Sequence, residues 1–155
     1  MTYDDFLKEK QKSVIKSGFE VKELNDHLFP FQDFIVRRAL LAGKYAVFAD
    51  TGLGKTIMQL EWAHRVAEYT ERPVLILAPL AVTSQTIEEG LKFGINVKRY
   101  GDIDADVYIT NYEQIDNVNV AQFSGIVLDE SSILKNYSGK YRSLLIDVFE
   151  NTPYK

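Results

Sequence analysis

Residues 49 to 56 read Ala-Asp-Thr-Gly-Leu-Gly-Lys-Thr, and they directly follow the apolar run Tyr45-Ala46-Val47-Phe48. A short apolar run of this kind is typical of a buried strand, and the residues from Lys55 onward have helical spacing. Glycines at positions 52 and 54 let the backbone approach a ligand closely, so that successive N–H groups can point at phosphate oxygens. The stretch therefore predicts a phosphate-binding loop. The alternative is a plain glycine-containing turn ahead of a helix.

The predicted loop gives each of its residues a role. Lys55 would reach the β- and γ-phosphates of ATP, and Thr56 would ligate Mg²⁺. The general motif has glycine where this chain has Ala49. The nucleotide-binding residues expected here are Thr51, Gly52, Leu53, Gly54, Lys55 and Thr56.

Composition allows a nucleotide-binding enzyme and excludes other classes. The chain has 155 residues, a formal charge of −4 and no cysteine, which excludes disulfides and thiolate metal sites and favours an intracellular setting. No apolar run approaches the roughly 18 residues that span a bilayer. We expect a cytoplasmic protein without membrane contact. The negative charge argues against a general nucleic-acid coat but leaves room for a local contact strip.

Apolar periodicity predicts alternating helices and strands. Helices are expected over 3–16, 30–42, 55–69, 79–93 and 141–149, and strands over 45–49, 74–78, 97–100, 107–110 and 125–128. The uninterrupted run Val74-Leu75-Ile76-Leu77-Ala78 is typical of a parallel strand that is covered on both faces. The pattern therefore predicts an α/β fold with a parallel sheet between helices. We expect one domain over 1–155, with a helical extension over 1–23 and a core over 24–155.

An acidic pair, Asp129-Glu130, follows the last apolar strand. The carboxyl ends of parallel strands line the ligand crevice, so this pair can face the phosphate-binding loop. Asp129 would then hold Mg²⁺, and Glu130 would orient and deprotonate the attacking water, with Lys55 as the second catalytic residue. Acidic residues at a strand end are also common as helix caps. The phosphate-binding loop favours the catalytic interpretation.

Four stretches resemble the first RecA-like ATPase domain of superfamily 2 helicases, in the branch of chromatin-remodeller-like translocases and their phage relatives. They are Leu28-Phe29-Pro30-Phe31-Gln32, similar to the glutamine motif; residues 49–56, similar to motif I; Leu75 to Pro79 with Val82 and Gln85, similar to motif Ia; and Ile109 to Glu113, similar to motif Ib. Leu128 to Ser132 stands where the family has Asp-Glu-Ala-His or Asp-Glu-Ala-Asp. The resemblance spans residues 24–150.

The resemblance implies further site residues and partners. Gln32 would read the adenine edge, and a nucleic acid, DNA rather than RNA, would contact Pro79, Thr83, Thr110 and Asn111. A surface glutamine and ordinary helix caps are the alternatives for these positions. The resemblance also implies a cytoplasmic bacterial or phage-infected setting.

Two departures from the family pattern have consequences. Ser131 and Ser132 replace the usual alanine and histidine or aspartate, which affects coupling to later motifs. The chain also reaches Lys155 before a motif III strand is recognisable, and it lacks the second RecA-like domain that carries the arginine finger. We therefore expect a slot between Val47 and Val127 that does not stay empty. The isolated chain should be marginally stable or prone to aggregation, unless another chain donates a strand or the sheet rearranges to bring the two strands together. A partner domain or chain would supply the strand and the arginine finger.

The function expected from these features is ATP binding, with Mg²⁺-dependent hydrolysis when a second domain completes the motor of a helicase or nucleic-acid translocase. The chain alone should bind ATP far better than it hydrolyses it. A nucleotide-binding regulatory module without motor activity is one alternative. A P-loop phosphotransferase is another, although residues 82–93 contain only Lys92 as a basic group for an acceptor lid.

Overall fold

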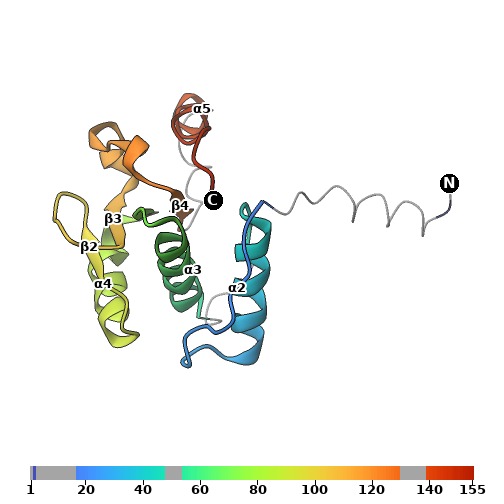
Figure 1. Cartoon of the computed structure of the whole chain (residues 1–155). Coiled ribbons are helices and arrows are strands. Elements are labelled where there is room, and N and C mark those ends of the chain that lie inside the picture. The colour runs from blue at the N-terminus through green and yellow to red at the C-terminus, as the bar shows by residue number, and fades with distance from the viewer. Residues whose placement is uncertain (1, 3–16, 48–53, 130–138) are drawn as a thin grey trace.

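The computed structural model describes residue 2 and the ranges 17–47, 54–129 and 139–155, with the side chains of 139–142 left out. Its centre is a sheet of four parallel strands in the order β2-β3-β1-β4 (Figure 1). Helices α3 and α4 cover one face, and α5 lies over the other (Figure 1). The predicted α/β fold with a parallel sheet between helices is confirmed.

The described elements have the following bounds. The strands are β1 (Val74–Ala78), β2 (Val97–Arg99), β3 (Val107–Asn111) and β4 (Gly125–Leu128). The α-helices are α2 (Pro30–Ala42), α3 (Lys55–Thr70), α4 (Thr83–Lys92) and α5 (Gly139–Val148). Short 3₁₀ helices are η1 (Leu80–Val82), η2 (Tyr112–Asn117) and η3 (Val120–Gln122). Within the described residues, no helix combines the length and the apolarity needed to cross a membrane.

Strand β1 organises the two hydrophobic cores because all five of its residues are buried. Side chains alternate between the faces of a strand. Val74 and Ile76 therefore pack in the core formed with α2, α3 and α4, while Leu75 and Leu77 pack in the core formed with η2 and α5. β1 pairs with β3 on one side and β4 on the other, in parallel register, so the carboxyl ends of three strands meet at one edge of the sheet.

Most predicted elements are confirmed, and two need correction. Helix α2 begins at Pro30 and is followed by Gly43, whose φ of 77° suits a glycine after a helix end. The helix expected over 79–93 starts as the 3₁₀ turn η1 because Pro79 is extended, and it becomes α-helical only at Thr83. Residues 45–47 do not form the expected strand, and the helix expected over 3–16 lies outside the described residues.

Residues 154 and 155 occupy part of the slot expected between Val47 and Val127. Tyr154 bridges to β4 in parallel, donating its N–H to Ser124 O (3.2 Å) and accepting from Ile126 N–H (2.9 Å). On the other side, Lys155 accepts from Tyr45 N–H (3.0 Å) and donates to Gly43 O (3.1 Å). Residues 154 and 155 thus join 43–45 to β4, which sequence periodicity over two residues could not predict.

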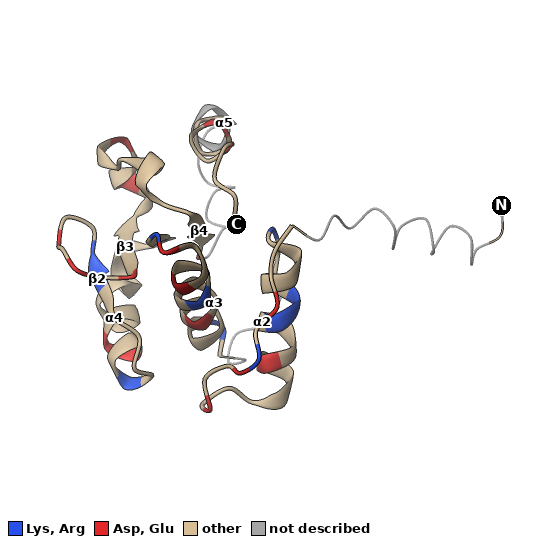
Figure 2. Ribbon diagram, viewed as in Figure 1, with Lys and Arg blue, Asp and Glu red and all other residues tan. Residues whose placement is uncertain are grey.

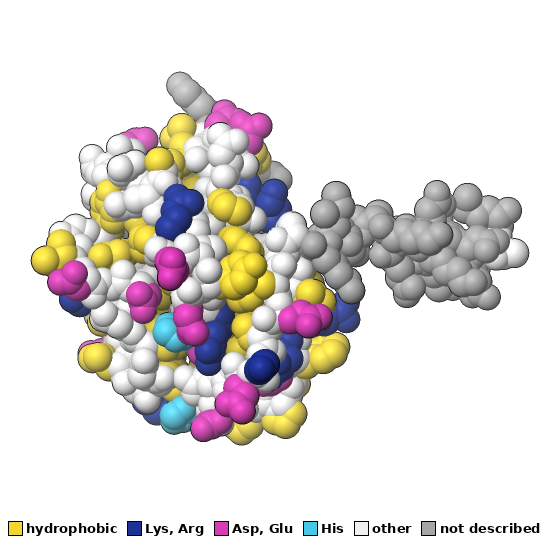
Figure 3. Space-filling view, viewed as in Figure 1, with side chains coloured by type: hydrophobic (Ala, Val, Ile, Leu, Met, Phe, Trp, Pro, Cys, Tyr) yellow, Lys and Arg dark blue, Asp and Glu magenta, His cyan; other side chains and the backbone are white. Residues whose placement is uncertain are grey.

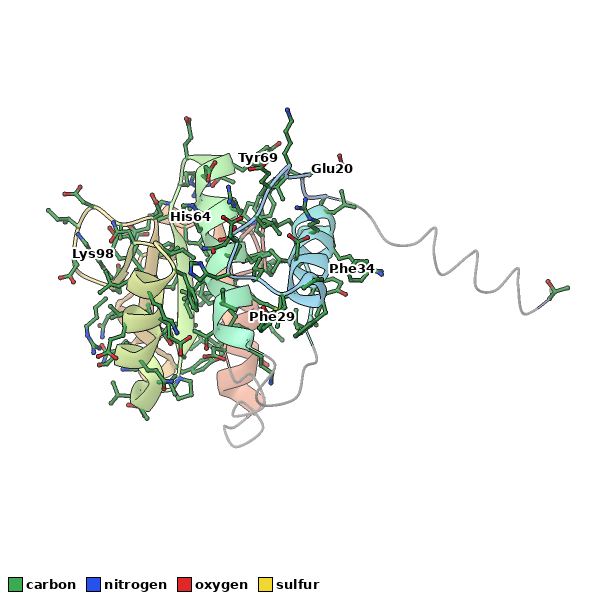
Figure 4. The ribbon with its side chains drawn as sticks, turned by 90° about the horizontal axis from the view of Figure 1, so that it is seen from below. Glu20, Phe29, Phe34, His64, Tyr69 and Lys98 are labelled. Atoms are coloured by element: carbon green, nitrogen blue, oxygen red, sulfur yellow. The ribbon has the colours of Figure 1, made fainter. Side chains whose placement is uncertain are left out.

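An aromatic cluster packs against Tyr154 at the place where residues 154 and 155 join β4 to residues 43–45. The Phe19 ring stacks on Tyr69 at 4.0 Å between centroids and meets Tyr154 edge-on at 5.8 Å. Figure 4 shows Tyr69 at the end of α3 beside the segment that carries Glu20. Tyr154 is buried, and burial raises the pKa of its hydroxyl. The described part of the expected N-terminal extension therefore packs on the core of the domain.

We expect Tyr154→Ala to lower the free energy of unfolding by about 3 kcal/mol or more, the usual cost of removing a buried aromatic ring. Tyr154→Phe should cost far less, because the ring and its contact with Phe19 remain. Chemical denaturation monitored by circular dichroism measures both changes. Ile146→Ala is the matched control, since Ile146 is 63% exposed. Equal losses for Tyr154→Ala and Ile146→Ala would contradict the packing described for Tyr154.

Candidate active site

The start of α3 carries the predicted phosphate-binding residues that the structure describes. Gly54 precedes the helix with φ 72° and ψ 43°, a left-handed conformation that favours glycine. Lys55 and Thr56 form the first turn and are half-buried, and this turn contains no acidic residue. The amino end of a helix carries free N–H groups and a partial positive charge, so it favours an anion. Thr51, Gly52 and Leu53 lie outside the described residues.

Gln32 lies against this turn from the neighbouring helix α2. A Cβ atom added to Gly54 would come within 2.2 Å of Gln32 Nε2, so the amide occupies the space that a larger residue at position 54 would need. Gln32 Oε1 accepts a hydrogen bond from Phe29 N–H (2.9 Å). The side chain is 3% exposed, which makes the surface-glutamine alternative wrong. The structure thus brings Gln32 and Gly54 together, and the adenine-reading role of Gln32 stays a prediction.

Asp129 is held at three points by three different elements. Its N–H donates to Leu77 O at the end of β1 (2.8 Å). Its carboxylate Oδ1 accepts from Gln59 Nε2 on α3 (2.9 Å), and its carbonyl oxygen accepts from the Tyr112 hydroxyl on η2 (2.8 Å). Glu130, Ser131 and Ser132 lie outside the described residues, so the role expected for Glu130 stays a prediction.

The bond between Gln59 and Asp129 connects the two predicted halves of the site. Gln59 is three residues after Thr56, so both side chains lie on the same side of α3. The carboxylate of Asp129 is therefore next to the first turns of the helix that follows the predicted loop. A hydroxyl and a carboxylate are hard oxygen donors, which suit Mg²⁺. The described residues contain no cluster of three metal-binding His, Cys, Asp or Glu side chains, and Mg²⁺ is commonly held by one or two protein groups together with phosphate and water.

A second polar site lies at the carboxyl ends of β2 and β3. It is a groove of about 230 Å³. Three of the four residues predicted to contact nucleic acid, Thr83, Thr110 and Asn111, line it, and they are joined by Arg99, Tyr100, Ile109, Gln114 and Asn117. Pro79 is outside the lining, although its carbonyl oxygen accepts a bond from Thr83 Oγ1 (3.4 Å). Asn111 Oδ1 is buried, and within the described part of the chain it has no hydrogen-bond partner.

Charge is distributed without a single dominant sign. Figure 2 shows acidic and basic residues interleaved along α2, α3 and α4, with basic residues on β2. These are Lys98 and Arg99. Arg99 is exposed, and its Nη2 donates to Ser84 Oγ (2.7 Å), which places the guanidinium at the rim. A groove of amides and hydroxyls with one nearby guanidinium can take both phosphate oxygens and neutral hydrogen-bonding groups.

Sequence reasoning missed three residues of this region. Neither Arg99 nor Gln59 nor Tyr112 was assigned a functional role of its own. Gln59 could have been found from its spacing to Thr56, because positions i and i+3 share a helix face. Arg99 could have been found from its position at the end of a strand. Nothing in the sequence indicates that the hydroxyl of Tyr112 reaches Asp129.

Aromatic side chains surround the start of α2 beside Gln32. Phe29 is 64% and Phe31 45% exposed, and their rings stack at 6.3 Å between centroids. Figure 4 shows Phe29 at the beginning of α2 and Phe34 directed outward from the helix. Figure 3 shows hydrophobic side chains at the surface over this part of the molecule. The base-binding end expected for a nucleotide therefore has exposed rings next to a buried amide.

Comparison with solved structures identifies the same fold in two proteins. The UvsW helicase from bacteriophage T4 superposes with a TM-score of 0.69 and 22% identity, over 100% of this chain and 58% of the helicase. The Sulfolobus solfataricus SWI2/SNF2 ATPase core domain superposes with a TM-score of 0.59 and 21% identity, over 84% of this chain and 30% of that one. The chain thus spans little more than half of the first structure and under a third of the second. No protein-family model and no curated protein sequence matches it.

We expect Gln59→Leu to weaken magnesium-dependent nucleotide binding about tenfold, the usual effect of losing a group that orients a metal ligand. Leucine keeps the shape of the side chain but cannot donate to Asp129 Oδ1. Calorimetric titration of ATP with and without Mg²⁺ separates the metal-dependent part of the affinity. Gln85→Leu is the control, because Gln85 is exposed on α4 and its amide contacts only Glu89 in the hydrogen bonds described (3.4 Å). Equal affinities for the native protein and Gln59→Leu would show that Asp129 needs no such support.

Proposed function

We propose that this chain is the ATP-binding domain of an ATP-dependent helicase or nucleic-acid translocase. One observation carries the proposal: the hydrogen bond between Gln59 and Asp129 holds the acidic end of β4 against the helix that begins with Lys55 and Thr56. A phosphate-binding helix start and an acidic strand end in contact are the parts that phosphoryl transfer needs. The fold shared with a helicase and a SWI2/SNF2 ATPase core supports this class of function.

Each group in the proposed site has a distinct task. Lys55 would balance the charge of the β- and γ-phosphates, and Thr56 and Asp129 would hold Mg²⁺. The ion, when bound, supplies the positive charge that neutralises charge developing on the transferred phosphoryl oxygens. Glu130 would accept a proton from the attacking water, which gives it a role only in the hydrolytic step. Gly54, with residues 51–53, would contribute backbone N–H groups to the phosphates.

The base of the nucleotide would meet α2. A carboxamide can donate to N7 and accept from the amino group of adenine, the pairing that glutamine makes with this base. The Gln32 amide lies close to Gly54. An adenine base that meets this amide would therefore lie near the phosphates that the loop around residue 54 would bind. The exposed rings of Phe29 and Phe31 offer a stacking surface beside it. The proposed nucleotide is therefore ATP.

The groove at the ends of β2 and β3 would bind the nucleic-acid backbone, DNA rather than RNA. Thr83, Thr110 and Asn111 provide neutral groups of the kind that contact phosphate and sugar, and Arg99 provides a cation at the rim. Complete turnover would need a second RecA-like domain that supplies an arginine finger, a group worth about 10³ to 10⁵ in rate where measured. The chain alone would then bind ATP with little hydrolysis.

The nucleotide site is tested with Lys55→Ala. Removing the cation that meets the phosphates should weaken Mg·ATP binding by about 10- to 100-fold, since a charged hydrogen bond contributes about 1.5–3 kcal/mol. The native protein should also prefer ATP to GTP. Isothermal titration calorimetry measures these affinities. Lys92→Ala is the control and should leave them unchanged, because Lys92 is the last residue of a different helix, α4. An unaltered ATP affinity in Lys55→Ala would remove the phosphate-binding assignment.

The groove is tested through the salt dependence of oligonucleotide binding. Each phosphate contact on a single strand contributes about 0.7 to the slope of log affinity against log salt concentration. Arg99→Ala should reduce the slope by about that amount. Arg38→Ala is the control, because Arg38 lies over the Phe34 ring on α2, and Figure 4 shows Phe34 on the opposite side of the molecule from Lys98. Fluorescence anisotropy gives the affinities, and an unchanged slope in Arg99→Ala would exclude the groove as a phosphate-binding site.

A further inference from the structure

One side chain connects the groove to the acidic end of β4. Tyr112 directly follows Asn111, the last residue of β3, whose side chain lines the groove. The Tyr112 side chain runs in the opposite direction, is 1% exposed, and donates its hydroxyl to the carbonyl oxygen of Asp129 (2.8 Å). A single residue therefore lies between the backbone that forms the groove and the backbone that carries the proposed metal ligand.

The surroundings of Tyr112 leave little room for it to move independently. Its ring belongs to a buried cluster with Leu75, Leu77, Ile115 and Phe123. Leu77 also accepts the N–H of Asp129 (2.8 Å), so Tyr112 and Asp129 are both anchored to the end of β1. Close-packed interiors compress little and transmit displacements. A shift of residues 111–112 is therefore passed to Asp129 and is not absorbed locally.

The contacts of Asp129 allow a shift of residues 111–112 to reach its carboxylate. Tyr112 holds the carbonyl group from one side, and Gln59 holds Oδ1 from the other. A displacement of the carbonyl group also displaces the Cα atom to which it is bonded, and with it the position of the carboxylate relative to Thr56. The same displacement would alter the fit of a metal ion between Thr56 and Asp129.

We propose that Tyr112 is a positioning residue that couples occupancy of the groove to the affinity of the nucleotide site for Mg·ATP. The inference rests on the proposed function, because it needs a nucleic-acid strand in the groove and Mg·ATP at Asp129. The coupling acts through the hydroxyl of Tyr112 and the backbone of Asp129. By linkage it is reciprocal, so Mg·ATP changes the affinity for the strand by the same factor.

The test is Tyr112→Phe in the full 155-residue chain. Mg·ATP affinity is measured by calorimetry with and without a saturating single-stranded DNA oligonucleotide, and oligonucleotide affinity is measured with and without Mg·ATP. In the native protein each ligand should change the affinity of the other by the same factor, about fivefold or more. In Tyr112→Phe this factor should fall to near one, whatever change the variant makes to the affinity for each ligand alone.

Tyr108→Phe is the matched control. Tyr108 lies on the same strand β3, and its hydroxyl accepts from Ala105 N–H (3.3 Å) instead of contacting Asp129. This variant loses the same oxygen atom and should keep the native coupling factor. A merely structural role of Tyr112 would lower the unfolding midpoint and weaken both ligands without changing the ratio.

Three results would overturn the inference and leave the proposed function intact. One is a native coupling factor in Tyr112→Phe, and another is an equal loss of coupling in Tyr112→Phe and Tyr108→Phe. The third is a native protein in which both ligands bind but neither changes the affinity for the other. Failure of the native protein to bind the oligonucleotide would instead refute the nucleic-acid part of the proposed function, and the inference with it.

Discussion

The complete burial of β1 is the constraint on which the rest of this molecule depends. A five-residue strand with every side chain buried needs a hydrophobic layer on each face and a hydrogen-bonded strand on each side. β3 and β4 provide the neighbours, and because both pairings are parallel, the residues after all three strands emerge at one edge. Pro79, Tyr112 and Asp129 are those residues. The packing of one apolar strand therefore positions both the candidate nucleotide site and the candidate groove.

The same arrangement explains why Asp129 is firmly held although it lies just after the end of β4. Its N–H bonds to β1, its carboxylate to α3 and its carbonyl oxygen to η2. Bonds to three elements that pack on both faces of the sheet leave the residue little freedom. Functional groups held by packed elements are positioned more accurately than groups on free loops. The half-buried carboxylate also has a hydrogen-bond donor in Gln59, so its position does not depend on a bound ion.

The helices and strands with strong apolar periodicity or clear boundary residues could be predicted from local sequence patterns. The apolar run at 74–78 and the proline-to-glycine interval from Pro30 to Gly43 match β1 and α2 as observed. Gln32, Gly54 and Asp129 were assigned to one site from motifs, and the structure brings Gln32 to Gly54 and Asp129 to α3. This proximity could be predicted because the loop and strand-end positions follow from chain topology, which periodicity reveals, whereas the roles assigned to these residues stay predictions.

What the sequence did not predict depends on contacts between distant segments. The pairing of Tyr154 and Lys155 with β4 and residues 43–45 involves two residues that have no periodicity of their own. The burial of Gln32 comes from its contact with residue 54 on another element, and the bond from Tyr112 to Asp129 crosses 17 positions of sequence. Each of these contacts can form only after the sheet is assembled. They therefore appear only in three dimensions, and the bond from Tyr112 to Asp129 joins the two candidate sites.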